Sequence, residues 1–143
     1  GTTVNTALKT YADLVKANTF DWAGRAVKVA VTGKFGGGGG TKTIYLYLGG
    51  NLVAGLVSIP SSTGFFKFEA AFFALVPGSQ RYSAFMLDSA AQNAPVSPCK
   101  GDSGARAYNL NTGSDLTLTV NGLLSNASDS IEIHSVEIWE TGA

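Results

Sequence analysis

A run of glycines stands directly before a lysine and a threonine, an arrangement that in phosphate-binding loops holds a nucleotide. Residues 36–43 read Gly-Gly-Gly-Gly-Gly-Thr-Lys-Thr. The phosphate-binding pattern needs a glycine before its lysine, and its loop leads into a helix whose N-terminal amides hold the phosphate. Here Thr41 replaces that glycine, and the run that follows, 44–48, alternates like a strand. A loop between two strands is therefore favoured, and no cofactor is expected.

Ser103 lies in a Gly-Asp-Ser-Gly segment like that around the nucleophile of chymotrypsin-like proteases. A serine nucleophile needs a histidine that takes its proton and an acid that orients this histidine. The single histidine, His134, follows the serine, whereas that family places it well before. Ala105 replaces the second glycine of the pattern, and Cys99 has no disulfide partner within the chain. The segment is interpreted as a turn, and neither Ser103→Ala nor Lys42→Ala is expected to change folding or activity.

Few other side chains are suited to catalysis. One histidine and one cysteine cannot complete a tetrahedral zinc site, and the acidic residues are too scattered for a calcium loop. Two carboxylates that meet in space could hydrolyse glycosides, but solvated carboxylates are the simpler interpretation. The chain is not expected to be an enzyme, and no catalytic, cofactor-binding or metal-binding residue is assigned. The carboxylates in predicted strands are Glu69, Asp88, Glu132, Glu137 and Glu140.

The composition is that of a compact domain with few charges. The 143 residues are 45% hydrophobic and 14% charged, include 18 glycines, and carry ten basic against ten acidic side chains. No basic cluster predicts nucleic-acid binding, because neutralised phosphates supply most of that affinity. No apolar run reaches the roughly 18 residues that span a bilayer, so membrane insertion is not expected. So few charges suit a β-protein whose surface is neutral or partly covered by neighbouring chains.

Apolar and polar residues alternate with period two over most of the chain, as in half-buried strands. Gly49 and Gly50 separate two such runs and predict a tight hairpin turn. We predict one all-β domain over 1–143, an antiparallel two-sheet β-sandwich, jelly-roll-like, with about eight strands and a long loop at 89–113. A weak helical pattern over 6–16 is interpreted as a strand. The predicted strands are 6–15, 26–35, 41–48, 51–59, 65–76, 80–88, 114–121 and 129–140.

The predicted strand over 65–76 is apolar on both faces. Phenylalanine, alanine and valine fill its even positions, and the odd positions include Phe65, Phe73 and Leu75. Antiparallel sheets usually leave one face to water, so this second face needs a cover, either the domain's own loop or another subunit. Each additional phenylalanine or leucine that is covered stabilises by about 1.5–3 kcal/mol. These three residues are the candidate oligomer interface, and a trimer is expected.

The last predicted strand contains two apolar pairs in opposite phases. The pairs are Ile131 with Ile133, and Val136 with Ile138. Side chains change face at every residue of a regular strand, so one pair would point into solvent. A bulge at His134-Ser135 would return both pairs to the core. We therefore predict a bulge at this place, with His134 as a partly exposed structural residue.

Three stretches of sequence show a pattern that extends over nearly the whole chain. Residues 14–20 read Leu-Val-Lys-Ala-Asn-Thr-Phe. Residues 33–50 join Gly-Lys-Phe, the glycine run and Thr-Lys-Thr-Ile-Tyr-Leu-Tyr-Leu-Gly-Gly, and residues 128–138 run from Ser-Asp-Ser-Ile-Glu-Ile to Val-Glu-Ile. In this order they resemble the opening strand, central hairpin and closing strand of bacteriophage fibre and spike proteins.

The resemblance implies a jelly-roll-like knob, commonly a homotrimer, on the head or tail of a virion. It implies structural partners, namely further copies of the chain and other virion proteins, and loops that meet the host surface or the capsid. It brings no catalytic residues. Localisation in the virion is the corresponding expectation.

The alternative is a carbohydrate-binding module of a cell-surface or secreted protein. Trp22, Tyr45, Tyr47 and Tyr82 are candidates for an aromatic platform that stacks against the rings of a glycan. Aromatic residues in strands more often pack than bind, so this alternative ranks second. A glycan array distinguishes it from the virion hypothesis.

Overall fold

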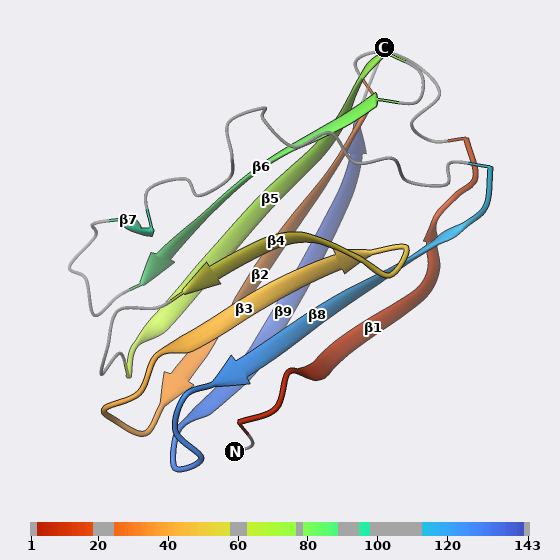
Figure 1. The fold of residues 1–143 in the computed structure, drawn as a ribbon. Helices are drawn as coiled ribbons and strands as arrows, with labels where there is room; N and C mark the ends of the chain where they lie inside the picture. The colour runs from red at the N-terminus through yellow and green to blue at the C-terminus, as the bar shows by residue number, and fades with distance from the viewer. Residues whose placement is uncertain are drawn as a thin grey trace.

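The computed structural model describes residues 3–18, 25–57, 63–76, 79–88, 95–97 and 113–141. In 51–57, 73–76, 79–88, 95–97 and at 141 it describes the backbone without the side chains. The described residues form strands and no helix (Figure 1). The strands are β1 (Thr6–Val15), β2 (Ala26–Gly36), β3 (Lys42–Leu48), β4 (Asn51–Val57), β5 (Phe65–Val76), β6 (Ser79–Asp88), β7 (Pro95–Ser97), β8 (Leu116–Leu124) and β9 (Ser130–Thr141).

The strands form two antiparallel sheets, which face each other as two layers (Figure 1). Sheet A has four strands in the order β1-β8-β3-β4, and sheet B has five in the order β7-β6-β5-β2-β9. Two neighbouring pairs, β3 with β4 and β5 with β6, are local hairpins. The pairs β1-β8, β3-β8 and β2-β9 join early strands to late ones. Strands from the first third of the chain therefore pair with strands from its last third in both sheets.

Each predicted strand range overlaps one observed strand. The segment with the weak helical pattern is a strand, β1, which pairs with β8. The short β7 is additional and lies within the predicted loop at 89–113, whose other residues, apart from Gly113, are outside the described part of the chain. The all-β architecture with antiparallel sheets was therefore predictable from the period-two pattern and the turn residues, except for β1, whose prediction as a strand rested mainly on the resemblance to phage fibre proteins.

The core lies between the sheets and takes side chains from both. The inward residues of β3 and β8 are fully or almost fully buried, and so are those of β2 and β5, as alternation predicts. The rings of Phe35 and Phe66 stack with their centroids 4.3 Å apart. The largest fully buried side chains include Phe35, Phe68, Phe72, Ile44, Leu46, Leu48 and Leu118. Burial of each contributes roughly 1.5–3 kcal/mol, which holds the two layers together.

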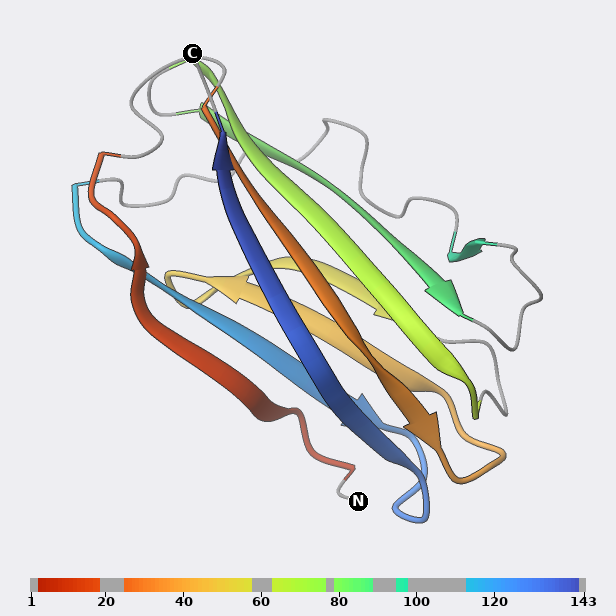
Figure 2. The ribbon, with the colours of Figure 1, turned by 180° about the vertical axis from the view of Figure 1, so that it is seen from behind.

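The predicted bulge in the last strand is confirmed. Thr32 of β2 pairs with Ser135, and the next residue, Gly33, pairs with Ile133, so His134 is the additional residue of β9. The four apolar residues of β9 on both sides of this bulge pack against the core. Figure 2 shows β9 lying along β2 at the edge of sheet B. Gly33 is required opposite the bulge, because a methyl group there would overlap the carbonyl oxygen of Glu132.

Candidate functional site

The outer face of sheet B carries an exposed aromatic residue with a lysine and a histidine against its ring. The side chain of Phe65 is 59% exposed, although it is large and apolar. Lys34, its register partner on β2, places Nζ 5.8 Å from the centroid of the ring. His134 meets the same ring edge-on at 5.9 Å, and its Nε2 lies 3.2 Å from Oε1 of Glu132. We call these four residues the Phe65 cluster.

A second exposed aromatic residue, Trp139, lies on β9 of the same sheet and is 45% exposed. β9 is an edge strand, and open edges can pair with other chains unless charges protect them. Glu132, Glu137 and Glu140 are exposed along β9. These carboxylates disfavour pairing through the edge, so the face of sheet B is the better surface for a specific contact.

The other two candidate interface residues, Phe73 and Leu75, belong to β5, but their side chains are outside the described part of the chain. In the backbone register Phe73 pairs with Ala26 on one side and Arg81 on the other. Phe65 is thus the candidate whose exposure the structure shows. The assignment of all three to an oligomer interface stays a prediction.

The outer face of sheet A carries a pair of tyrosines next to a short chain of amides. Tyr45 and Tyr47 of β3 are half-buried, with ring centroids 6.4 Å apart and planes inclined by 53°. Asn5 donates from Nδ2 to Oη of Tyr47 at 2.9 Å and accepts at Oδ1 from Nδ2 of Asn121 at 3.0 Å. Oδ1 of Asn121 is covered and has no hydrogen-bond partner among the described residues.

The four aromatic residues considered for glycan binding do not all meet. Tyr45 and Tyr47 are neighbours in sheet A, whereas Tyr82 lies on β6 in sheet B. Trp22 is outside the described residues. The aromatic surface that the structure shows is therefore a pair of tyrosines, extended by the side chains of Asn5 and Asn121.

A lysine and an aspartate are buried together at one end of the two sheets. The side chains of Lys42 and Asp129 are both 0% exposed, and Nζ lies 3.6 Å from Oδ2. Neither oxygen of the carboxylate has a hydrogen-bond partner within the described part of the chain. Lys42 begins β3 in sheet A, and Asp129 immediately precedes β9 in sheet B. The pair therefore connects the two sheets.

The glycine loop encloses this pair. The loop between β2 and β3 lies at the same end of the fold as the turn between β8 and β9 (Figures 1 and 2). A methyl group on Gly40 would overlap Oδ2 of Asp129, and one on Gly37 would stand 2.6 Å from Oδ1. Gly37 also has φ of 76°, a left-handed conformation that suits glycine. Ser125 Oγ accepts a hydrogen bond from the amide of Thr41 at 2.8 Å, which holds the loop against the turn.

These contacts revise the interpretation of Lys42. The glycine run does connect two strands, as predicted, but its lysine points into the protein and toward Asp129. Removal of one partner of a buried ion pair leaves an uncompensated charge. The expectation that Lys42→Ala leaves folding unchanged is therefore wrong. We now expect this substitution to lower the free energy of unfolding substantially. Sequence patterns missed Asp129, because nothing near it in the chain indicates burial.

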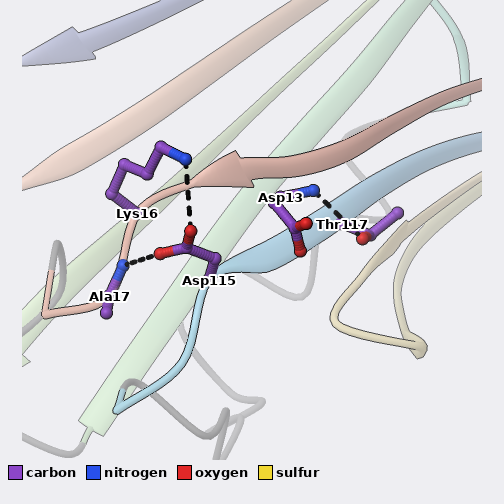
Figure 3. Close-up of polar contacts among 5 residues, drawn as sticks. All are labelled: Asp13, Lys16, Ala17, Asp115 and Thr117. Atoms are coloured by element: carbon purple, nitrogen blue, oxygen red, sulfur yellow. Dashed lines mark hydrogen bonds and ion pairs between the residues drawn. The ribbon is translucent and has the colours of Figure 1, made fainter.

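A third polar cluster fastens the end of β1 to the beginning of β8 (Figure 3). Asp115 accepts from the amide of Ala17 at 2.8 Å and contacts Nζ of Lys16 at 3.1 Å. Close by, the amide of Asp13, a residue with φ of 52°, donates to Oγ1 of Thr117 at 3.2 Å. The backbone hydrogen bond from Ala17 and the side chain of Lys16 lower the pKa of Asp115. These contacts are exposed, and they join the end of β1 to the beginning of β8. The role of the cluster is therefore structural.

The lowered pKa of Asp115 predicts a contribution to stability that depends on pH. Because the folded carboxyl has the lower pKa, its contribution is present above the unfolded pKa of 3.8 and is lost as the pH falls through the folded value. Asp115→Asn should therefore be less stable than the wild type at neutral pH, and the difference should shrink on acidification. Urea unfolding of both proteins at several pH values measures this.

Asp13→Asn is the matched control, because the backbone of Asp13, and not its carboxylate, takes part in this corner. Asparagine also tolerates the left-handed conformation at this position. The control should follow the wild type across the same pH range. A difference for Asp115→Asn that grows as the pH falls would contradict the assignment.

No protein-family model matches the chain, and no curated protein matches it. In the described ranges no helix is long and apolar enough to cross a membrane.

The same residues contain no group of three or more histidine, cysteine, aspartate or glutamate side chains that could hold a metal ion. Ser103 and Cys99 are outside the described residues. Of the candidate carboxylates, Glu69 lies 3.2 Å from Nζ of Lys67 on the same strand.

Proposed function

We propose that the protein is a structural component of a bacteriophage virion, a fibre, spike or capsid-decorating knob. In this proposal it acts without catalysis, assembles as a homotrimer and presents its loops to the host surface or to the capsid. The observation that carries the proposal is the Phe65 cluster, in which an exposed aromatic side chain on the face of a sheet contacts a lysine and a histidine.

An isolated exposed apolar residue is common on proteins and needs no explanation. Phe65 differs because Lys34 places its ammonium group over the ring and His134 meets the ring edge-on, and these contacts favour one orientation of the side chain. Aromatic side chains that are already oriented lose little entropy on binding, and they are enriched at the energetic centres of interfaces. A second copy that covered Phe65 and Trp139 would remove the two largest exposed aromatic side chains of sheet B, among the described residues, from water.

The strand pairing supports the jelly-roll-like part of the proposal. Jelly rolls pair early strands with late ones, and β1-β8, β3-β8 and β2-β9 do so here. Two of the segments that resemble phage fibre proteins also meet in space. The central segment supplies Lys42 and the closing segment supplies Asp129 of the buried pair. This contact supports treating the two segments as one structural unit.

The oligomeric state tests the proposed assembly. The wild type should sediment as a trimer, and Phe65→Asp should sediment as a monomer, because a carboxylate would have to be buried in the interface. Val4→Asp is the control, since Val4 is 66% exposed but precedes β1 and lies outside sheet B. The control should stay trimeric. A wild type that is monomeric at high concentration, or a trimeric Phe65→Asp, would contradict this interface.

The virion itself tests the location. Electron microscopy of purified phage particles with mass spectrometry should find this chain among the structural proteins. Its absence from particles whose genome encodes it would overturn the proposal, whatever its oligomeric state.

Glycan binding by the outer face of sheet A is the second candidate function. The tyrosine pair offers ring faces for stacking against the rings of a glycan. A glycan array with the wild type should give a signal that Tyr47→Ala abolishes. Phe65→Asp should retain that signal, because Phe65 belongs to the other sheet. An array without any bound glycan would exclude this candidate.

A further inference from the structure

The buried pair at the end of the two sheets combines the amine of Lys42 with the carboxyl group of Asp129. Nζ of Lys42 and Oδ2 of Asp129 are 3.6 Å apart, and both side chains are 0% exposed. A buried carboxylate is normally stabilised by several hydrogen bonds, yet neither oxygen of Asp129 has one among the described residues. The carboxylate of Asp129 is therefore buried with little stabilisation beyond its contact with Lys42.

We infer that Lys42 and Asp129 react with each other to form an intramolecular isopeptide bond. The inference goes beyond the proposed function and does not depend on it. Its basis is the direct apposition of the two groups, their complete burial and the unsatisfied carboxylate oxygens. The bond would join the first residue of β3 to the residue before β9 and would therefore link sheet A to sheet B.

The reaction balances without any co-reactant. A proton passes from the Lys42 ammonium group to the Asp129 carboxylate, since surroundings without water disfavour the separated charges. The lone pair of the neutral Nζ then attacks Cγ of the carboxylic acid, and a carbon–nitrogen bond forms. The bond from Cγ to the hydroxyl group breaks, and this hydroxyl leaves with a proton of the amine as water. Nothing is oxidised or reduced, and the product is an uncharged amide.

The fold supplies the proximity that the reaction needs. Groups held in a reactive orientation reach effective concentrations of roughly 10⁵–10⁸ M, so a reaction that is negligible between free side chains becomes feasible. Gly37 and Gly40 bring the loop backbone so close to the carboxylate that a methyl group at either position would collide with it. The enclosure keeps out the water that would otherwise solvate the charges and reverse the reaction.

The bond would do for this chain what a disulfide does in others. Its one cysteine cannot form an internal disulfide. A covalent link between residues 42 and 129 would close a loop over more than half of the chain and restrict the unfolded state. It would also prevent the two sheets from separating at this end of the fold.

Mass spectrometry of the full wild-type chain tests the inference. The denatured protein should be lighter than its sequence by one water molecule. Trypsin should leave Lys42 uncut and release a branched peptide in which residues 35–67 are joined to residues 107–143. Lys42→Met should have the full mass and no branched peptide, and this is measurable even if the variant does not fold.

Two outcomes would overturn the inference. One is a wild-type chain of full mass that trypsin cleaves after Lys42, which would show an ion pair only. The other is the loss of one water without the branched peptide, which would show a cyclised aspartate elsewhere. Neither outcome affects the sedimentation or particle experiments that test the proposed function.

Discussion

Lys42→Met should lower the free energy of unfolding by about 3–5 kcal/mol, because it leaves the carboxylate of Asp129 buried without its counter-ion. Methionine resembles lysine in length and shape, so the change removes the charge without opening a large cavity. Asp129 is 1% exposed and cannot reach water unless the glycine loop opens. Urea unfolding followed by tryptophan fluorescence or circular dichroism measures the loss.

The double variant Lys42→Met/Asp129→Leu separates the cost of the orphaned charge from every other effect. Replacing both partners of a buried pair by apolar residues is often neutral or stabilising. The double variant should therefore be several kcal/mol more stable than Lys42→Met alone. Neither variant can form the isopeptide bond, so their difference does not depend on whether the wild type is cross-linked. Equal stabilities would show that Asp129 carries no buried charge in the single variant.

Strand positions could be predicted from the sequence because alternation is a local signal. Large apolar residues recur at alternate positions in β2, β3 and β8, and the structure buries these residues. The bulge at His134 was also predictable, because two apolar pairs in opposite phases allow few other solutions. Both inferences need only the period of a strand and the preference of large aliphatic side chains for the core.

The buried pair was not predictable, because its signal is not local. Lys42 follows a glycine run, and Asp129 stands between two serines, contexts that are typical of exposed loops. Only the closing contact of β2 with β9, and of β3 with β8, brings these distant positions together. The separation of Tyr82 from Tyr45 has the same origin, since alternation does not say which sheet a strand joins.

The glycine loop gives the second large effect. Gly40→Ala should destabilise the protein by about 1–3 kcal/mol, the usual cost of forcing extra volume into a packed site. The added methyl group would overlap Oδ2 of Asp129, stand 2.7 Å from Ser125 Oγ and press against Asn126. The carboxylate has little freedom to move away, since it is fully buried and in contact with Lys42.

Gly38→Ala is the matched control, two residues away in the same loop. A methyl group on Gly38 meets nothing within 4 Å, and Gly38 is not among the glycines with a positive φ. This change should be neutral or stabilise by about 0.4–1 kcal/mol, because alanine reduces the freedom of the unfolded chain. Gly39 would be a poor control, since its φ of 95° strains any other residue. If the loop were only a flexible connection between β2 and β3, both alanines would have the same small effect. A difference of more than about 1 kcal/mol between them, measured by urea unfolding, would instead require a glycine loop that is packed around Asp129.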